Sequence, residues 1–209
     1  MCGQRLTQHS CTVPEISAIV LAGGQSQRLG GDKALLRLGN EWLLEQILLK
    51  LSVLSQDVSI VSSDGEKLEP FGARVVPDMF VGLGPLGGIY SGLRSMQCAR
   101  GLFVACDMPF LNLELLRYMI LLSRDFDVVI PRIGEFVEPL HAIYSTACLG
   151  PMANALAGPE RRVVRFLPQV RVRYIEEHES SAFDPQHWSW FNVNTPADLA
   201  RAQELLGKG

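Results

Sequence analysis

A glycine-rich segment near the start of the chain combines the features of a loop that binds phosphate. The segment reads LAGGQSQRLGGDK over residues 21–33 and follows a short apolar run at residues 16–21, which predicts a buried strand. Glycine lets backbone N–H groups approach an anion, while Arg28 offers a planar fork and Lys33 a compact charge. The spacing fits neither GxGxxG nor GxxxxGK[ST]. We therefore expect a polyphosphate loop of a different nucleotide fold; the alternative is a surface turn that binds nothing.

Asp107 is the acidic residue best placed to bind a metal. It comes directly after the apolar run at residues 102–106, and Pro109 prevents that strand from continuing. Open α/β sheets bind ligands at the carboxyl ends of their strands, and Mg²⁺ takes one or two carboxylate ligands while it keeps several waters. We expect Asp107 to be an exposed carboxylate that holds Mg²⁺. The structural alternative is a turn or capping aspartate before Asn112.

The elements that would position these residues alternate along the chain. Strands are predicted at residues 16–21, 57–61, 74–76, 102–106 and 126–130, the last ended by Pro131. Helices are predicted at residues 41–51 and 86–96 and from an Asn112 cap to about residue 122. Such alternation predicts a single α/β domain with a Rossmann-like, mostly parallel sheet and helices on both faces. Lys50, in the first of these helices, has no motif around it.

The last third of the chain has a less regular pattern. Residues 137–144 look extended, 147–156 helical, and 170–175 alternate between apolar and polar, so this part can mix strand directions. Thr195 is expected to cap a final helix with Pro196 at its first position. The residues of that helix expected to face inward are Leu199, Ala202 and Leu206.

Composition excludes several classes of partner. The 209 residues carry a net charge of −3, which gives no basic field for nucleic acid or a membrane surface. The five cysteines form no CxxC pair and predict free thiols in a reducing compartment. Residues 1–14 are polar and lack the apolar run of a signal peptide. We expect a cytoplasmic protein with a flexible tail at residues 1–14 and one domain at residues 15–209.

Four segments in matching order give the chain a specific resemblance. They are the loop at residues 21–33, Asp78 followed by GLGPLGGI, CDMPFL at residues 106–111 and FNVNTPADL at residues 191–199. Together they resemble the molybdenum cofactor guanylyltransferase (MobA) family of nucleotidyltransferases over about residues 16–206. The resemblance implies Mg²⁺-dependent transfer of GMP from GTP to the phosphate of molybdopterin or Mo-molybdopterin, with release of pyrophosphate.

The resemblance also implies roles for individual residues. The implied nucleotide-binding residues are Leu21, Ala22, Gly23, Gly24, Lys33, Asp78 and Asp107, with Asp107 as the metal ligand. Lys33 and Arg28 would act on the reacting phosphate and the leaving pyrophosphate. Gly23 and the pair at residues 85–86 favour GTP over CTP. The alternative to a nucleotide-binding role for Asp78 is that of an ordinary loop residue after Pro77.

The acceptor site is less defined by the sequence. Its candidates are Asn194, Arg161 and His141, in the part of the chain where the family binds its pterin. Of two adjacent helical arginines, such as Arg161 and Arg162, one usually points to solvent. The structural alternative for His141 is a hydrogen-bonded strand residue, and for Asn194 it is a residue at the start of a helix.

Other functions remain open at this stage. The enzyme alternatives are cytidylyl transfer to the same pterin and a sugar-phosphate nucleotidyltransferase. A nucleotide sensor or carrier without chemistry is the alternative from another class. The family also implies transient contacts with proteins of molybdenum insertion and molybdoenzyme maturation, and we expect neither nucleic acid nor membrane as a partner.

Overall fold

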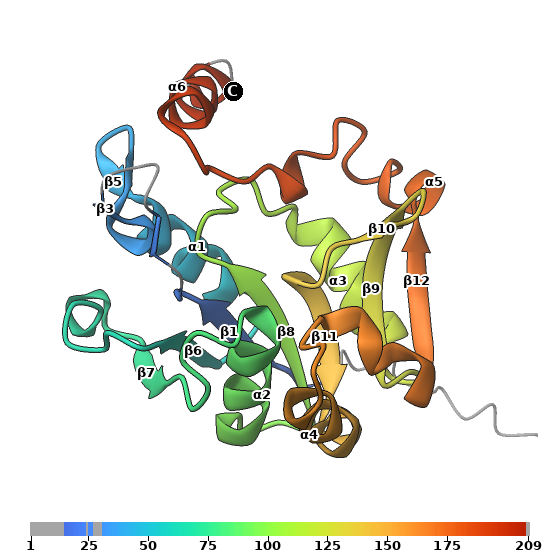
Figure 1. Ribbon diagram of the computed structural model, residues 1–209. Coiled ribbons are helices and arrows are strands. Elements are labelled where there is room, and N and C mark those ends of the chain that lie inside the picture. The colour runs from blue at the N-terminus through green and yellow to red at the C-terminus, as the bar shows by residue number, and fades with distance from the viewer. Residues whose placement is uncertain (1–14, 24, 27–30, 208–209) are drawn as a thin grey trace, which may run out of the picture.

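An eight-stranded mixed sheet forms the centre of the molecule (Figure 1). The computed structural model describes residues 15–23, 25–26 and 31–207. The strands of the sheet are β1 (Ser17–Leu21), β6 (Asp57–Ser62), β7 (Arg74–Pro77), β8 (Arg100–Ala105), β9 (Val128–Ile133), β10 (Phe136–Val137), β11 (His141–Ser145) and β12 (Val172–Glu176). They lie in the order β10-β9-β11-β8-β1-β6-β7, with β12 paired to β9. All run in one direction except β10 and β11, so the predicted mostly parallel sheet is confirmed.

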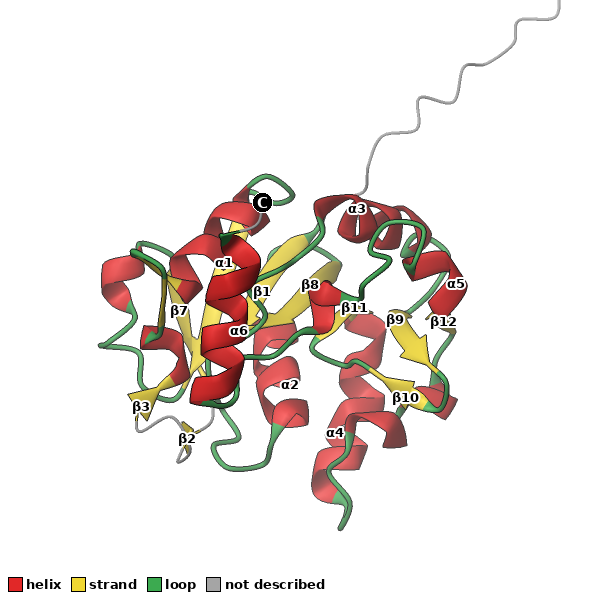
Figure 2. Cartoon of the chain, turned by 90° about the horizontal axis from the view of Figure 1, so that it is seen from above, coloured by secondary structure: helices red, strands yellow, loops and turns green. Residues whose placement is uncertain are grey.

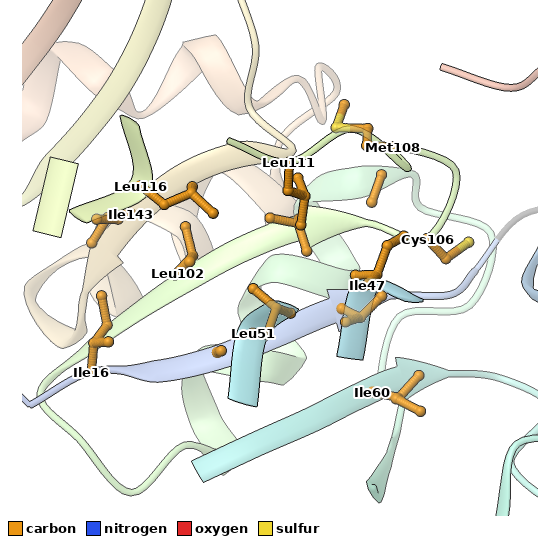
Figure 3. Packing of buried hydrophobic residues seen from close by; sticks show 14 of the residues in the cluster. Ile16, Ile47, Leu51, Ile60, Leu102, Cys106, Met108, Leu111, Leu116 and Ile143 are labelled. Carbon is orange, nitrogen blue, oxygen red and sulfur yellow. The ribbon is translucent and has the colours of Figure 1, made fainter. Parts of the chain in front are cut away.

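Helices cover both faces of the sheet, as Figure 2 shows. One face packs against α1 (Leu43–Ser52) and α3 (Leu113–Leu122), and the other against α2 (Pro85–Ser95) and α4 (Leu149–Ala157). After Ser17, strand β1 is apolar because its alternate residues enter both cores: Ala18 and Val20 the first, Ile19 and Leu21 the second. Figure 3 shows the first core, with Ile47 and Leu51 of α1 above the strands.

Short elements fill the connections. The two-residue strands are β2 (Gln25–Ser26), β3 (Gly31–Asp32), β4 (Arg37–Leu38) and β5 (Glu41–Trp42); the remaining helices are α5 (Glu177–Ser180) and α6 (Pro196–Leu206). The 3-10 turns are η1 (Lys33–Leu35), η2 (Glu69–Phe71), η3 (Thr146–Cys148), η4 (Val163–Arg165), η5 (Leu167–Gln169) and η6 (Trp188–Trp190). None of the helices in the part of the chain that the structure describes is long and apolar enough to cross a bilayer.

The order of the strands creates a crevice beside β1. From β1 the chain builds β6 and β7 on one side and then returns to place β8 on the other. Open α/β sheets bind ligands at such a reversal, outside the carboxyl ends of the strands. Leu21 ends β1 there and Ala105 ends β8, and the two residues are register partners.

Pro131 does not end β9, which is a correction to the sequence analysis. The strand continues to Ile133, and Pro131 is paired with Ile175 of β12. The carbonyl of Pro131 accepts a hydrogen bond from the Glu138 N–H at 3.1 Å, on the side where β9 forms a hairpin with β10. The nitrogen and the carbonyl of one strand residue point to the same side, so the Pro131 nitrogen also faces this hairpin. On this side β11 pairs only as far as Val129 and β10 starts at Arg132, so no ladder bond requires the missing N–H.

Helix α6 begins as predicted and ends differently. Thr195 and Asp198 form a reciprocal capping box, and Pro196 is the first helical residue. Ala202 is buried with Val193 in a small third core, but Leu206 is 44% exposed, so its predicted inward position is wrong. The last turn of α6 therefore extends beyond the small core on which the helix packs.

Substitution of Gly92 tests the close packing of α2 on the sheet. A Cβ at Gly92 would lie 2.6 Å from Phe103 Cε1 and 3.0 Å from Ile19 Cγ2. We expect Gly92→Ala to lower the free energy of unfolding by about 1–3 kcal/mol. Gly150 in α4 is the control, because its added Cβ meets nothing within 4 Å; Gly150→Ala should stabilise by about 0.4–1 kcal/mol. Equal changes in urea unfolding would contradict the tight packing at Gly92.

Candidate active site

A cleft of about 600 Å³ opens at the carboxyl ends of β1, β6 and β8. Its walls include Leu21 and Gly23 after β1, Ser63 after β6, and Cys106 and Asp107 after β8. The loop before α2 closes another side with Gly82, Gly84 and Pro85, while Leu140 and Asn192 come from the later part of the chain. The volume is that of a pocket for a small-molecule ligand. The crevice predicted by the strand order is therefore a real cleft.

Lys33, Asp107 and Asn194 meet at this cleft from three distant segments. The Lys33 ammonium donates to Asp107 Oδ2 at 2.7 Å and also to Asn194 Oδ1. Lys33 begins the turn η1, whose Ala34 is fully buried and anchors it. Asp107 follows β8, and Asn194 precedes the capped start of α6. The arrangement places a cation and a carboxylate next to each other on a cleft wall.

Asp107 is buried, contrary to the expectation of an exposed carboxylate. Only 7% of the residue is exposed. The approach to α6 passes over it, since the Val193 N–H donates to the Asp107 carbonyl at 2.9 Å. Asp107 lies at the end of its strand as predicted, but the segment that covers it comes 86 residues later in the chain, which local sequence does not indicate.

The second oxygen of Asp107 has the character of a ligand atom. Oδ1 is buried and has no hydrogen-bond partner among the described residues, whereas Oδ2 accepts from Lys33. Buried carboxylate oxygens are rarely left in this state. The described residues contain no group of three or more His, Cys, Asp or Glu side chains arranged to hold a metal ion. A cation bound at Oδ1 would therefore take most of its ligands from water and a bound anion, which hard divalent cations accept.

Asp78 is held on the opposite side of the cleft by α2. Its Oδ1 accepts the Phe80 N–H at 2.9 Å and lies 3.1 Å from the Ser91 hydroxyl oxygen. Ser91 is buried, and its oxygen also accepts the Met79 N–H at 2.9 Å. Ser91 thus fixes both Asp78 and the loop after it, a role that no sequence motif indicated.

Glycines shape the loop between Asp78 and α2. Gly82 and Gly84 have φ of +81° and +74°, a conformation that other residues rarely adopt. A Cβ at Gly87 would lie 2.7 Å from the Phe80 Cβ, so this loop can pack closely on α2 only with glycine there. The cleft consequently has a wall of exposed backbone.

The remaining predicted residues are placed less uniformly. Ala22 is buried directly behind the cleft and donates its N–H to Val61 O at 2.9 Å. Arg161 is exposed, its Nε donates to Leu156 O at 3.2 Å, and it does not line the cleft. Gly24 and Arg28 lie outside the described residues.

Two residues near the cleft were not assigned a role from the sequence. Asn192 lines the cleft two positions before Asn194, within the same motif. Glu138 belongs to the turn that precedes β11, where its Oε1 accepts the Leu140 N–H at 3.1 Å. Burial raises the pKa of Glu138, and the negative charge of Asp107 adds to this. The sequence contains the segment EPLH at residues 138–141, but its position next to Asp107 depends on the antiparallel direction of β11.

His141 is a buried strand residue and not part of the cleft wall. It pairs with Val104 in the sheet and has no exposed surface, and neither ring nitrogen has a hydrogen-bond partner in the described part of the chain. Its ring meets the edge of Trp190 at 6.3 Å, and Trp190 stacks on His187 at 5.0 Å. Burial lowers the pKa of His141 to about 4, although the charge of Asp184 opposes this. His141 is therefore neutral in the folded protein at pH 7.

Comparison with known proteins gives consistent matches. Residues 18–173 match the family model described as MobA-like NTP transferase domain. A protein of Pelotomaculum thermopropionicum named probable molybdenum cofactor guanylyltransferase is 40% identical, covering 91% of this chain and 93% of that protein. The molybdenum cofactor guanylyltransferase of Syntrophotalea carbinolica is 34% identical over 88% of this chain and 89% of its own.

A solved structure extends the match to the fold. The crystal structure of molybdopterin-guanine dinucleotide biosynthesis protein A from Archaeoglobus fulgidus superposes with a TM-score of 0.81 at 29% identity. The match covers 93% of this chain and all of that one.

The buried His141 predicts a pH dependence of stability. In the unfolded chain the side chain binds its proton near pH 6.5, but in the fold only near pH 4. Between these values the unfolded state holds more protons, so lowering the pH should reduce the free energy of unfolding by about 3 kcal/mol in total. In urea unfolding at several pH values, His141→Phe should flatten this dependence, and replacement of the exposed His178 should not. An unchanged pH slope in His141→Phe would contradict the assignment.

Proposed function

This chain belongs to the family of MobA-like NTP transferase domains, and we propose that it transfers GMP from GTP to the phosphate of molybdopterin. The products are molybdopterin guanine dinucleotide and pyrophosphate. The observation that carries the proposal is the meeting of Lys33 and Asp107 on the wall of the nucleotide-sized cleft at the carboxyl edge of the sheet. The relatives named guanylyltransferase match along nearly the whole chain, which favours guanylyl over cytidylyl transfer and over a carrier without chemistry.

In the proposed reaction an oxygen of the acceptor phosphate attacks the α-phosphorus of GTP in line. The new P–O bond forms as the bond to the bridging oxygen of the β-phosphate breaks, and pyrophosphate leaves with that electron pair. The attacking phosphate is already anionic, so no general base is required. The protein contributes mainly by position and charge.

Lys33 is proposed to neutralise charge at the α-phosphate. Its ammonium reaches the cleft and is held by Asp107 and Asn194, so it is oriented before the nucleotide arrives. Arg28, in the same loop, is proposed to bind the leaving pyrophosphate through its fork of N–H donors. Asn194 is our candidate contact on the acceptor side, and the exposed Arg161 remains a candidate for the acceptor phosphate.

Mg²⁺ is the proposed cofactor, and Asp107 is the residue that would hold it. The fit rests on the buried Oδ1, which no other described residue contacts by a hydrogen bond, and on the preference of Mg²⁺ for hard carboxylate oxygens. When bound, Mg²⁺ supplies Lewis-acid stabilisation of charge on the phosphate oxygens.

Guanine is proposed to lie against the glycine-rich wall. Gly82 and Gly84 are exposed and line the cleft, and a purine edge can be read there by backbone N–H and C=O groups. Asp78, fixed by Ser91, lies on the same wall. We also propose that the reaction takes place in the cytoplasm and that the protein makes transient contacts with proteins of molybdenum insertion and molybdoenzyme maturation.

Nucleotide preference tests the proposed base. We expect GTP to bind at least tenfold more tightly than CTP or ATP in the presence of Mg²⁺, about 1.4 kcal/mol, because only guanine would pair fully with the glycine-rich wall. Isothermal titration calorimetry with the three nucleotides measures this directly. Equal affinity for GTP and CTP would remove the basis for guanylyl specificity.

Asp107→Asn tests the metal ligand with little change in shape. We expect turnover, measured as pyrophosphate release with GTP, molybdopterin and Mg²⁺, to fall by 10²- to 10³-fold, which corresponds to about 3–4 kcal/mol. The variant should fold, since Lys33 keeps Asn194 as an acceptor. The exposed Asp125, at the opposite edge of the sheet, supplies the control Asp125→Asn. A folded Asp107→Asn enzyme with normal turnover at low Mg²⁺ would exclude Asp107 as the ligand.

A further inference from the structure

Lys50 makes contacts that the sequence did not indicate. It lies in α1, and its ammonium donates to the carbonyl of Pro109 at 2.9 Å and to that of Leu111 at 3.4 Å. Both acceptors belong to the short connection that follows Asp107 and leads to α3. A helical lysine without a motif is thus joined to the segment that carries the proposed metal ligand.

The two carbonyls need this donor. Pro109 and Leu111 are buried, and no backbone N–H of the described residues donates to either carbonyl. Buried carbonyls without a partner destabilise the conformation that contains them. Lys50 is half-buried, and this burial lowers its pKa. Hydrogen bonds from a charged donor in such a place are stronger than those between neutral groups.

The connection between β8 and α3 is held at several points, and Lys50 holds it from α1. At its start, the Cys106 N–H donates to Leu21 O at 3.1 Å, and at its end, the Asn112 N–H donates to the Ser189 hydroxyl oxygen at 3.3 Å. Apolar contacts with α1 complete the support: Figure 3 shows Ile47 and Leu51 in one cluster with Cys106, Met108 and Leu111. The Val193 N–H also donates to the Asp107 carbonyl at 2.9 Å. Among the bonds of the described residues, only those of Lys50 reach the carbonyls of Pro109 and Leu111.

We propose that Lys50 is a positioning residue, which holds the 108–111 backbone so that the Asp107 carboxylate stays aimed into the cleft. The inference rests on the proposed function in one respect, namely that Asp107 holds Mg²⁺. Lys50 touches neither substrate nor metal in this proposal. Loss of its two hydrogen bonds lets the connection relax, and the cost appears as weaker metal binding at Asp107.

Arg100 provides a matched control for Lys50. It also uses a charged group to bind two loop carbonyls, those of Ser123 and Arg124. However, Arg100 begins β8, whereas Asp107 follows the end of that strand, so the contacts of Arg100 lie at the opposite edge of the sheet. Arg100→Met therefore removes the same type of contact at a place remote from the cleft.

The experiment measures GTP binding by calorimetry across a Mg²⁺ series, with thermal melts and steady-state kinetics of the same variants. We expect Lys50→Met to raise the half-saturating Mg²⁺ concentration by about tenfold or more, as loss of an outer partner of a metal ligand does. High Mg²⁺ should restore much of the lost kcat. Lys50→Arg, which can reach both carbonyls with charged donors, should remain within about threefold of the unmodified protein. Arg100→Met should lower the melting temperature without moving the Mg²⁺ dependence.

Two outcomes separate the inference from the proposed function. A folded Lys50→Met protein with an unchanged half-saturating Mg²⁺ concentration, while Asp107→Asn raises it, would overturn the role of Lys50 alone. An unchanged value in Asp107→Asn would overturn the proposed metal site itself. If Lys50→Met does not fold, Lys50→Leu, which also lacks a donor, replaces it, and an unchanged value in that variant counts against the role of Lys50 in the same way.

Discussion

The ion pair between Lys33 and Asp107 is the interaction on which the arrangement of the cleft depends. Asp107 is almost fully buried and Lys33 is partly buried, and a charge in such a place is stable only when an opposite charge or a polar partner is close. The pair joins segments 74 residues apart, and Asn194 adds a third segment 161 residues from Lys33. The first loop, the end of β8 and the start of α6 must therefore be in place together.

Strand β11 is the second constraint on the site. It runs antiparallel between β8 and β9, so the chain must turn at the carboxyl edge of the sheet before it enters β11. This turn brings Leu140 to the cleft and Glu138 into the field of Asp107. An all-parallel sheet would place a crossover there instead, so the mixed topology supplies the wall that faces the later part of the chain.

The sequence predicted the features that local chemistry determines. The apolar run of β1 is buried on both faces, and the caps at Asn112 and Thr195 follow from hydrogen bonds between near neighbours. Asp107 could be placed at a strand end for the same reason.

The features that could not be predicted depend on contacts between distant segments. Pro131 is tolerated in β9 because the ladder changes partner there, and Asp107 is covered by the approach to α6. His141 enters the core without a hydrogen-bond partner from any described residue. Lys50 and Ser91 bind backbone groups of loops that are distant in the sequence, so their own sequence neighbourhoods do not indicate these contacts.

The direction of β1 has a practical consequence as well. The exposed Glu15 precedes the strand at the edge opposite the cleft, whereas α6 packs beside Val193 and begins next to Asn194. A fluorophore or a surface linker attached at Glu15 leaves the cleft accessible, and the same attachment on the first turn of α6 lies beside the cleft entrance.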